Sequence, residues 1–337
     1  MTRLWFFLTG IAVLFIAGCS SPVQYRSGFA LGTICTVTLY DNGTPQVYSD
    51  VFTRLREIEN LMSAFMEGSD VDRINKAAGI EAVRVNQDVF HVIERSVYYA
   101  ELSVGAFDPT VGPLVAIWGI GGENPRVPAR EEIDDVLPLI NWRDIELDRK
   151  NKTVFLKKPG MALDLGAIAK GYAAEEAAVI IKKAGIPQAM INIGGHILTV
   201  GEKKDGSLWR IGVQNPLNVR GSYIGTVQTT EKTLSTSGVY ERFFIDNGVH
   251  YHHLLSPSLG YPADNGLLSV SIITDASMDA DALSTAVFVM GYEKGRAFVE
   301  SLEGVDALFV FDDRSIYSTG GVDFIIVDEN YHIRNPM

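Results

Sequence analysis

The chain has 337 residues, and 47% of them are hydrophobic, so it can bury a sizeable core as one large domain or two closely packed lobes. Its formal net charge of −12 argues against non-specific binding of nucleic acid, which needs a positively charged surface. The two cysteines, Cys19 and Cys35, are too few for a disulfide framework. The composition therefore predicts a protein of one large domain or two closely packed lobes, without a nucleic-acid partner.

The first residues resemble the signal peptide of a bacterial lipoprotein. A short basic start is followed by an apolar run from Leu4 to Ala17 and then by Gly18 and Cys19. The run is too short to span a membrane as a mature helix. We therefore predict a signal peptide over residues 1–18, a lipid on Cys19, a tether over 19–27 and one unit of two closely packed lobes over 28–337. The alternative is a plain signal peptide with a chance cysteine. The lipid would anchor the chain on the periplasmic side of a bacterial membrane.

The hydrophobic pattern along the chain predicts an α+β protein with mixed sheets and flanking helices, without strict βαβ alternation. Alternating β-branched residues over 28–40 predict one strand, which ends at the turn Asp41-Asn42-Gly43. Apolar residues at spacings of three and four predict a helix over 45–65. Further helices are expected over 70–76, 87–104, 278–290 and 293–302, a hairpin over 145–156, and strands over 189–193, 209–213, 222–229, 242–245, 268–273, 305–311 and 324–327.

A stretch of small residues, Asp164 to Glu175, predicts the opening of a helix that ends at Ala184. Glycine and alanine in its first turn let the backbone approach another group closely. Free backbone amides at a helix N-terminus, together with Lys170, suit an anion such as a phosphate. The alternative is an ordinary helix start that packs under a sheet.

A second stretch, Ala276 to Ala286, places two oxygen-bearing side chains four residues apart. On a helix, Asp281 and Thr285 would lie on one face, one turn from each other. Such hard oxygen ligands suit Mg²⁺, and no cluster of His and Cys with zinc spacing is present in the sequence. The alternative is a capping carboxylate and a threonine that bonds back to its own helix.

Other segments contain residues with either a functional or a structural interpretation. His253 leaves a strand and enters a turn-rich loop, where it is either a general base or a structural group. His196 follows a pair of glycines that can lie near a ligand. The segments 107–114 and 236–242 are rich in turns and hydroxyl groups, so they either line a pocket or connect elements.

Taken together, the ordered set of segments resembles the ApbE family, the FAD:protein FMN transferases. The resemblance covers most of the chain. It rests on Ser69-Asp70-Val71, Phe107 to Leu114, Asp164 to Glu175, Ile191 to Gly195, Trp209 to Val213, Ser235 to Arg242, His253 with Pro257 and Gly260, and Ala280-Asp281-Ala282 with Thr285.

The resemblance implies an ApbE-like, T-fold-like architecture and a reaction. The family binds FAD and Mg²⁺ and moves FMN to a threonine or serine of a partner flavoprotein, with release of AMP. It implies that Asp281, Thr285 and the Ala167 carbonyl bind Mg²⁺, and that His253 and Asp281 are catalytic. The residues that it places at FAD are Phe65, Asp108, Thr110, Lys170, Ser237, Gly238 and His253.

Three alternative functions remain open at this point. The same site could work as an Mg²⁺-dependent FAD pyrophosphatase, with water as the nucleophile and FMN and AMP as products. A non-catalytic lipoprotein that stores FAD is a different class, but it would not need a metal at the pyrophosphate. A solute-binding lipoprotein would fit the first residues and the length, but it would not explain the ordered segments.

Overall fold

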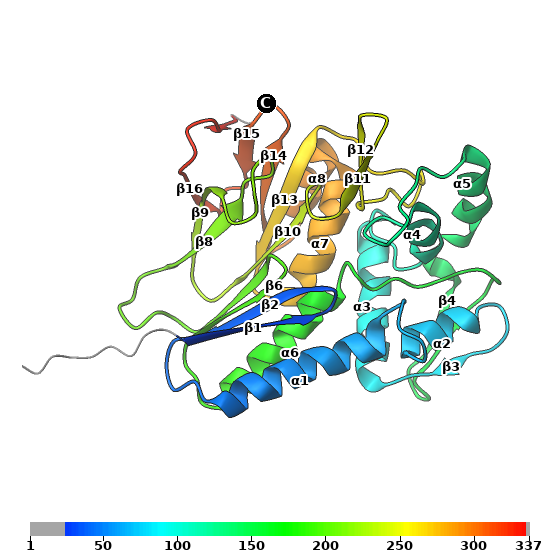
Figure 1. Cartoon of the computed structure of the whole chain (residues 1–337), viewed down its shortest axis with the longest axis horizontal. Coiled ribbons are helices and arrows are strands. Elements are labelled where there is room, and N and C mark those ends of the chain that lie inside the picture. The colour runs from blue at the N-terminus through cyan, green and yellow to red at the C-terminus, as the bar shows by residue number, and fades with distance from the viewer. Residues whose placement is uncertain (1–23, 335–337) are drawn as a thin grey trace, which may run out of the picture.

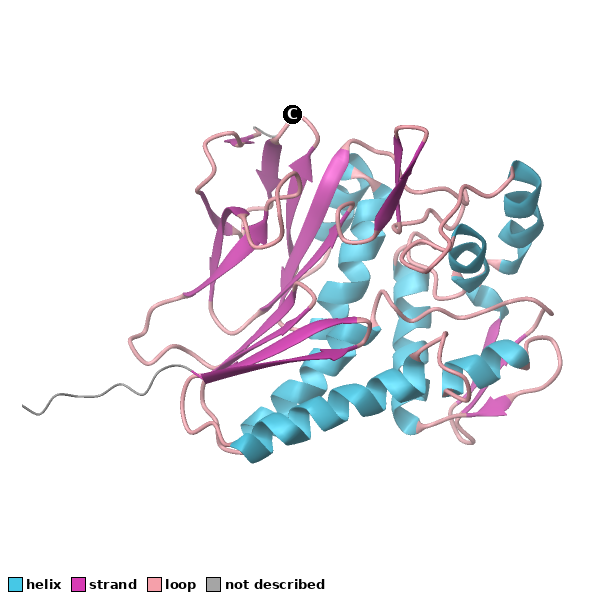
Figure 2. Ribbon diagram, in the orientation of Figure 1, coloured by secondary structure: helices cyan, strands magenta, loops and turns pink. Residues whose placement is uncertain are grey.

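The computed structural model describes residues 24–334, and these form a mixed sheet covered on both faces (Figures 1 and 2). The order of the nine strands in this sheet is β1-β2-β6-β7-β10-β13-β14-β15-β17, and each neighbouring pair is antiparallel except β15 and β17. The strands are β1 (Gln24–Ala30), β2 (Thr33–Leu39), β6 (Ala189–Ile193), β7 (His196–Val200), β10 (Thr233–Gly238), β13 (Leu267–Thr274), β14 (Asp306–Phe311), β15 (Ser315–Ser318) and β17 (His332–Ile333).

Three smaller sheets surround the central one. One joins β16 (Asp323–Ile326), β9 (Tyr223–Thr229) and β8 (Trp209–Gln214), and another joins β3 (Val83–Arg84), β5 (Thr153–Leu156) and β4 (Ile145–Asp148). The third is a hairpin of β11 (Phe243–Asp246) and β12 (Val249–His252).

Long helices cover the face of the central sheet that is opposite the β8–β9–β16 sheet (Figure 2). Residues 24–334 contain the helices α1 (Pro45–Met62), α2 (Asp70–Lys76), α3 (Gln87–Leu102), α4 (Gly112–Trp118), α5 (Arg130–Val136), α6 (Ala169–Lys183), α7 (Ser277–Met290) and α8 (Tyr292–Glu300), with 3₁₀ turns at Leu137–Leu139 and Trp142–Asp144. The short helices α4 and α5 do not belong to this layer and pack together in a separate apolar cluster. Side chains of a strand alternate between its two faces. On β13, Val270 and Ile272 therefore join the cluster under the helices, whereas Ile273 joins the cluster under the small sheet.

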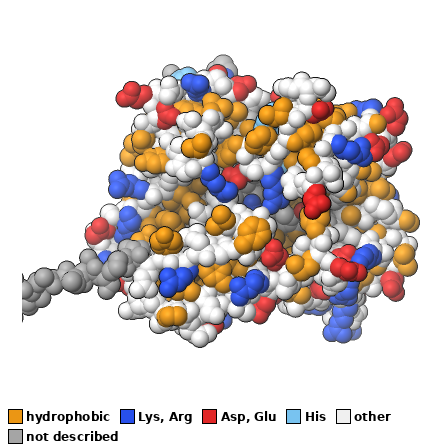
Figure 3. Space-filling model, viewed as in Figure 1, with side chains coloured by type: hydrophobic (Ala, Val, Ile, Leu, Met, Phe, Trp, Pro, Cys, Tyr) orange, Lys and Arg blue, Asp and Glu red, His pale blue; other side chains and the backbone are white. Residues whose placement is uncertain are grey.

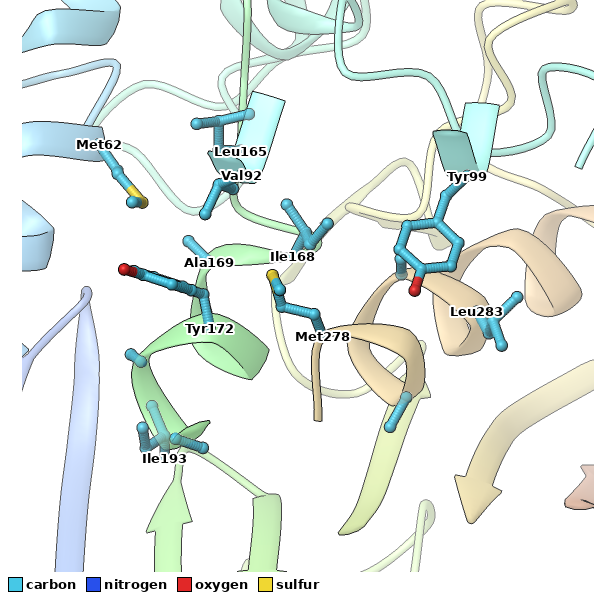
Figure 4. Packing of buried hydrophobic residues seen from close by; sticks show 14 of the residues in the cluster. Met62, Val92, Tyr99, Leu165, Ile168, Ala169, Tyr172, Ile193, Met278 and Leu283 are labelled. Carbon is cyan, nitrogen blue, oxygen red and sulfur yellow. The ribbon is translucent and has the colours of Figure 1, made fainter. Parts of the chain in front are cut away.

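The main apolar cluster lies where α1, α3, α6 and α7 meet the central sheet. Figure 4 shows Tyr172 of α6, Met278 and Leu283 of α7, and Tyr99 of α3 pointing into it. Their side chains are almost completely buried. The main apolar cluster therefore fixes the two helices that carry the stretches predicted to be functional, 164–175 and 276–286.

The N-terminal strand differs from the prediction. Residues 28–40 were expected to form one strand, but the chain reverses at Leu31 and Gly32 and forms the hairpin β1–β2. Leu31 has a φ of 55°, a left-handed conformation that its residue type does not predict. Strand β1 starts at Gln24, so residues 24–27, which were expected in a tether, belong to the sheet.

The predicted signal peptide and the lipid on Cys19 lie outside the described residues. Within residues 24–334, each helix is too short or too polar to cross a membrane.

Candidate active site

Helices α6 and α7 cross closely, and a glycine makes this approach possible. A Cβ atom on Gly171 would lie 2.5 Å from the Ser277 carbonyl oxygen and 2.7 Å from the Met278 Cα. Both distances are too short for a real side chain, so this position requires glycine. Figure 4 shows Ile168 and Met278 side by side near the crossing. The crossing brings the two functional stretches of the sequence together.

Asp281 lies at this crossing, is 2% exposed, and has different partners for its two oxygens. The Gly171 backbone amide donates a hydrogen bond to Oδ2 at 2.9 Å. Oδ1 lies 3.5 Å from the Ser235 hydroxyl, 3.7 Å from His196 Nδ1 and 3.8 Å from Lys170 Nζ. A buried carboxylate normally has close partners, because burial without them is costly. These long distances leave Oδ1 able to bind a further cation.

The turn before α6 offers a second oxygen. In a regular helix, the Gly171 amide would donate to the Ala167 carbonyl, four residues earlier. That amide donates to Asp281 instead, and within the described chain no hydrogen bond to the Ala167 carbonyl occurs. The Ala167 carbonyl oxygen is therefore free to bind a cation. It lies four residues before Gly171, whose amide holds the Asp281 carboxylate.

Thr285 offers a third oxygen and does not follow the structural alternative. Its Oγ1 lies 3.2 Å from Ser237 Oγ of β10, whereas the hydroxyl that bonds back to the helix is that of Ser284, which donates to the Asp281 carbonyl. Asp281 itself accepts from α6 and does not cap its own helix.

A carboxylate, a carbonyl and a hydroxyl oxygen fit a hard cation such as Mg²⁺, which also keeps several waters. This set contains one acidic side chain. Accordingly, no group of three or more His, Cys, Asp or Glu side chains suited to a metal occurs among residues 24–334. The donor set therefore fits Mg²⁺ better than it fits a soft metal.

His253 follows β12 and carries a lone pair suited to accept a proton. Its Nδ1 lies 3.2 Å from the Arg242 carbonyl oxygen. Because a carbonyl only accepts, we assign the ring proton to Nδ1 and the lone pair to Nε2. Burial, followed by the positive charges of Arg242 and Lys170, lowers the pKa of His253 to about 3. Lys170, whose Nζ lies 3.8 Å from Asp281 Oδ1, is therefore also one of the positive charges that lower the pKa of His253.

Lysine, serine and glycine residues complete the surroundings of the crossing. The Lys170 side chain is 31% exposed, and Ser237 is buried between β10 and α7. A Cβ atom on Gly238 would lie 2.5 Å from the Tyr240 ring, so glycine at this position lets that ring pack against the backbone. On the face shown in Figure 3, Lys and Arg side chains lie on both sides of a hollow near the middle.

Asp108 and Thr110 bond to a neighbouring loop and not to the crossing. Asp108 accepts hydrogen bonds from the Thr110 amide and hydroxyl, at 2.8 and 2.6 Å, and from the Trp142 amide at 3.1 Å. Thr110 Oγ1 accepts from the Asn141 amide at 2.9 Å. These bonds hold the segment before α4 in place. A contact of either side chain with FAD stays a prediction.

Phe65 lies in the loop between α1 and α2 and is 81% exposed. Its backbone amide donates to the Ser63 hydroxyl at 3.2 Å, which fixes the backbone while the ring stays in solvent. An aromatic ring with so little packing contributes little to folding, but it can stack on a planar ligand.

Sequence reasoning placed His196 near a ligand but did not place His196 or Ser235 beside Asp281, where the structure has both. His196 is 2% exposed, and burial lowers its pKa to about 4. Gly194 and Gly195, with φ angles of 60° and 96°, form the tight turn that pairs Ile193 with His196. This glycine pair was the only signal for His196 in the sequence.

Comparison with known proteins identifies the family. Residues 31–309 match the model of the ApbE family. This chain belongs to the ApbE family. Two relatives named FAD:protein FMN transferase, from Treponema pallidum and Klebsiella pneumoniae, are 35% and 36% identical to this ApbE chain. The first match covers 88% of this chain and 87% of the relative, and the second covers 92% and 97%.

Solved ApbE structures confirm the predicted α+β architecture. The ApbE protein of Thermotoga maritima is similar with a TM-score of 0.80 and 34% identity, over 91% of this chain and 97% of that one. The flavin transferase ApbE from Vibrio cholerae is similar with a TM-score of 0.77 and 26% identity, over 92% and 99%.

Proposed function

We propose that this chain is an FAD:protein FMN transferase that requires Mg²⁺ and attaches FMN to a threonine or serine hydroxyl of an acceptor flavoprotein, releasing AMP. The observation that carries the proposal is the incompletely paired carboxylate of Asp281, which is buried and has Lys170 Nζ 3.8 Å from its Oδ1. Membership of the ApbE family and the names of the relatives support the reaction.

Three oxygens would hold the metal: Asp281 Oδ1, the Ala167 carbonyl and Thr285 Oγ1. When bound there, Mg²⁺ would neutralise charge that develops on the pyrophosphate oxygens during cleavage. Lys170 adds a positive charge for the same pyrophosphate, and the exposed Phe65 offers a surface for the flavin ring.

His253 takes the proton of the attacking hydroxyl. The hydroxyl oxygen forms a bond to the phosphorus of the FMN half, the bond from that phosphorus to the bridging oxygen breaks, and AMP leaves with the bridging oxygen. The proton passes to Nε2 of His253. A bound pyrophosphate would offset the positive charges of Arg242 and Lys170, which raises the pKa of His253 from about 3 toward the range useful for a general base.

The experiment incubates the chain from Cys19 onward with FAD, Mg²⁺ and an acceptor domain that carries a target threonine. The mass of the acceptor and the released nucleotides are followed together. We expect an acceptor heavier by one FMN, with one AMP released for each. FMN and AMP beside an unchanged acceptor would favour the pyrophosphatase, and intact FAD would contradict both activities and favour storage.

Two variants make the same assay specific for the site. Asp281→Ala should fold but lose Mg²⁺-dependent turnover. The control is Asp275→Ala, which removes a carboxylate just before α7 whose side chain is 78% exposed and pairs with Lys232. Turnover by Asp281→Ala at the rate of the control would exclude Asp281 as a metal ligand.

The same proposal includes a lipid anchor at Cys19 and a periplasmic location. It is supported by the apolar run that ends at Ala17 and by the position of Cys19 shortly before the first strand, which begins at Gln24. In bacteria that export the protein, Cys19→Ala should move it from the membrane to the soluble fraction without loss of activity. A variant that remains lipid-labelled and membrane-bound would contradict the anchor.

A further inference from the structure

His196 connects Asp281 to the start of α7 through two serines. Its Nδ1 lies 2.9 Å from Ser235 Oγ of β10, and its Nε2 lies 2.6 Å from Ser277 Oγ, at the first residue of α7. The Ser235 hydroxyl in turn lies 3.5 Å from Asp281 Oδ1. All four side chains are buried, so water does not compete for these hydrogen bonds.

The direction of each hydrogen bond follows from the carboxylate. An ionised Asp281 only accepts, so the Ser235 hydroxyl donates to it. That hydroxyl must then accept from the Nδ1–H group of His196. In a neutral ring the other nitrogen, Nε2, carries no proton and accepts from the Ser277 hydroxyl. One arrangement of protons therefore satisfies all these groups and fixes the direction of the Ser235 hydroxyl.

We propose that His196 is a positioning residue for the metal-binding carboxylate, acting through Ser235 on Asp281 Oδ1. The inference rests on the proposed Mg²⁺ site. Without the Nδ1–H donor, the Ser235 hydroxyl could rotate toward His196 or its own strand and leave Oδ1 without an oriented partner. Partners that orient a ligand in this way typically change metal affinity by about 10–100-fold.

Two substitutions separate this role from a structural one. In His196→Asn, the side-chain NH₂ group takes the place of Nδ1–H and can still donate to Ser235. In His196→Gln, the longer side chain reaches toward Ser277 in the place of Nε2 and loses the donor to Ser235. Each variant keeps one of the two serine contacts, so both should fold with similar losses of thermal stability.

The test is calorimetric titration of Mn²⁺ into each purified chain in the presence of saturating FAD. We expect His196→Asn to bind the metal within about threefold of the wild type, and His196→Gln to bind at least about tenfold more weakly. Ser235→Ala should weaken Mn²⁺ binding as much as His196→Gln does. The double variant Ser235→Ala/His196→Gln should bind Mn²⁺ no more weakly than either single variant, because both substitutions break the same connection from His196 through Ser235 to Asp281.

Ser96→Ala is the control for general destabilisation, since it removes a buried hydrogen bond within α3, from Ser96 to the Val92 carbonyl. It should lower the melting temperature without changing the affinity for Mn²⁺. Equal affinity of His196→Asn, His196→Gln and the wild type would overturn the role of His196 while leaving the metal site intact. A wild-type chain that binds no Mn²⁺ with FAD would overturn both the metal site and this inference.

Discussion

Asp108 and Asp281 are both buried carboxylates at predicted functional positions, but they differ in their partners. Both oxygens of Asp108 accept close hydrogen bonds, Oδ1 from Thr110 in its own loop and Oδ2 from the Trp142 amide of a neighbouring loop. Asp281 has one close partner on Oδ2, and its Oδ1 has none nearer than 3.5 Å. A saturated carboxylate stabilises the fold, whereas one with unused lone pairs is able to bind a ligand.

Asp108→Asn should therefore affect stability more than FAD binding. The amide would weaken hydrogen bonds that the carboxylate accepts from Thr110 and Trp142, which costs about 1–3 kcal/mol of the free energy of unfolding. Denaturant unfolding measures this loss, and fluorescence titration measures the affinity of the folded variant for FAD. Weakened FAD binding with unchanged unfolding would instead place Asp108 at the ligand.

Phe65→Ala should affect FAD binding more than stability. The ring is 81% exposed, so its removal should change the free energy of unfolding by less than about 0.5 kcal/mol. Loss of stacking worth about 1 kcal/mol should raise the KM for FAD about fivefold. Ile80→Ala is the matched control, because Ile80 is 74% exposed on another loop. Equal KM values for the two variants would remove Phe65 from the flavin site.

At the scale of elements, the site depends on the close crossing of α6 and α7. Gly171 has no side chain to separate the helices, and its amide holds Asp281 across the crossing. The same amide is diverted from the Ala167 carbonyl, which leaves that oxygen available. One glycine thus prepares two of the proposed metal ligands.

Gly171→Ala should lower both stability and metal affinity. The added methyl group would meet backbone atoms of Ser277 and Met278, and such overpacking typically costs about 1–3 kcal/mol. Thermal unfolding and Mn²⁺ titration of the variant measure the two effects. Gly320→Ala is the control, since a Cβ atom there would meet no atom within 4 Å. If Gly171→Ala bound Mn²⁺ as tightly as this control, the close crossing of α6 and α7 would not be needed for metal binding.

The elements that the sequence predicted well are those with a strong local pattern. The long helices α1 and α3 bury one periodic face, α7 is apolar and buried on most of its sides, and the structure confirms these helices and α6 within a few residues. Strand β10 was missed because its sequence, Thr233 to Gly238, is rich in hydroxyl groups and resembles a turn. It is a strand because β13 pairs with all six of its residues, a long-range contact that local propensity cannot reveal.

The same division applies to the site. Helical spacing brought Asp281 and Thr285 to one helix, and the small residues around Gly166 indicated a close approach. The neighbours that complete the site, His196 and Ser235, come from other strands, so spacing along the chain could not place them beside Asp281.

At the scale of the whole molecule, burial keeps several histidines neutral. The pKa of His252 is lowered to about 4 by burial and by His250, and that of His196 is also lowered to about 4. In the unfolded chain a histidine has a pKa near 6.5. Below about pH 6.5 the unfolded chain therefore binds protons that the folded chain does not, and these histidines lower the free energy of unfolding as the pH falls toward 4. Partly buried acids such as Asp164 and Glu175, whose pKa is raised by desolvation, have the opposite effect on the free energy of unfolding as the pH falls.

His252→Gln isolates one of these contributions. Between pH 7.5 and pH 5, His252 should lower the free energy of unfolding by about 2 kcal/mol, since each pKa unit corresponds to about 1.4 kcal/mol. Over this pH interval, the free energy of unfolding of the variant should therefore fall by about 2 kcal/mol less than that of the wild type. Denaturant unfolding without metal measures the difference. Parallel pH profiles for the two chains would contradict a neutral, buried His252.

The central claim is that the crossing of α6 and α7 holds the metal that acts on the pyrophosphate of FAD. The most direct measurement is an anomalous difference map of the crystallised chain with FAD and Mn²⁺. The account predicts one peak within bonding distance of Asp281 Oδ1, the Ala167 carbonyl oxygen and Thr285 Oγ1, with the pyrophosphate on its open side. A peak at other residues, or FAD bound with its pyrophosphate away from Asp281 and Lys170, would contradict it.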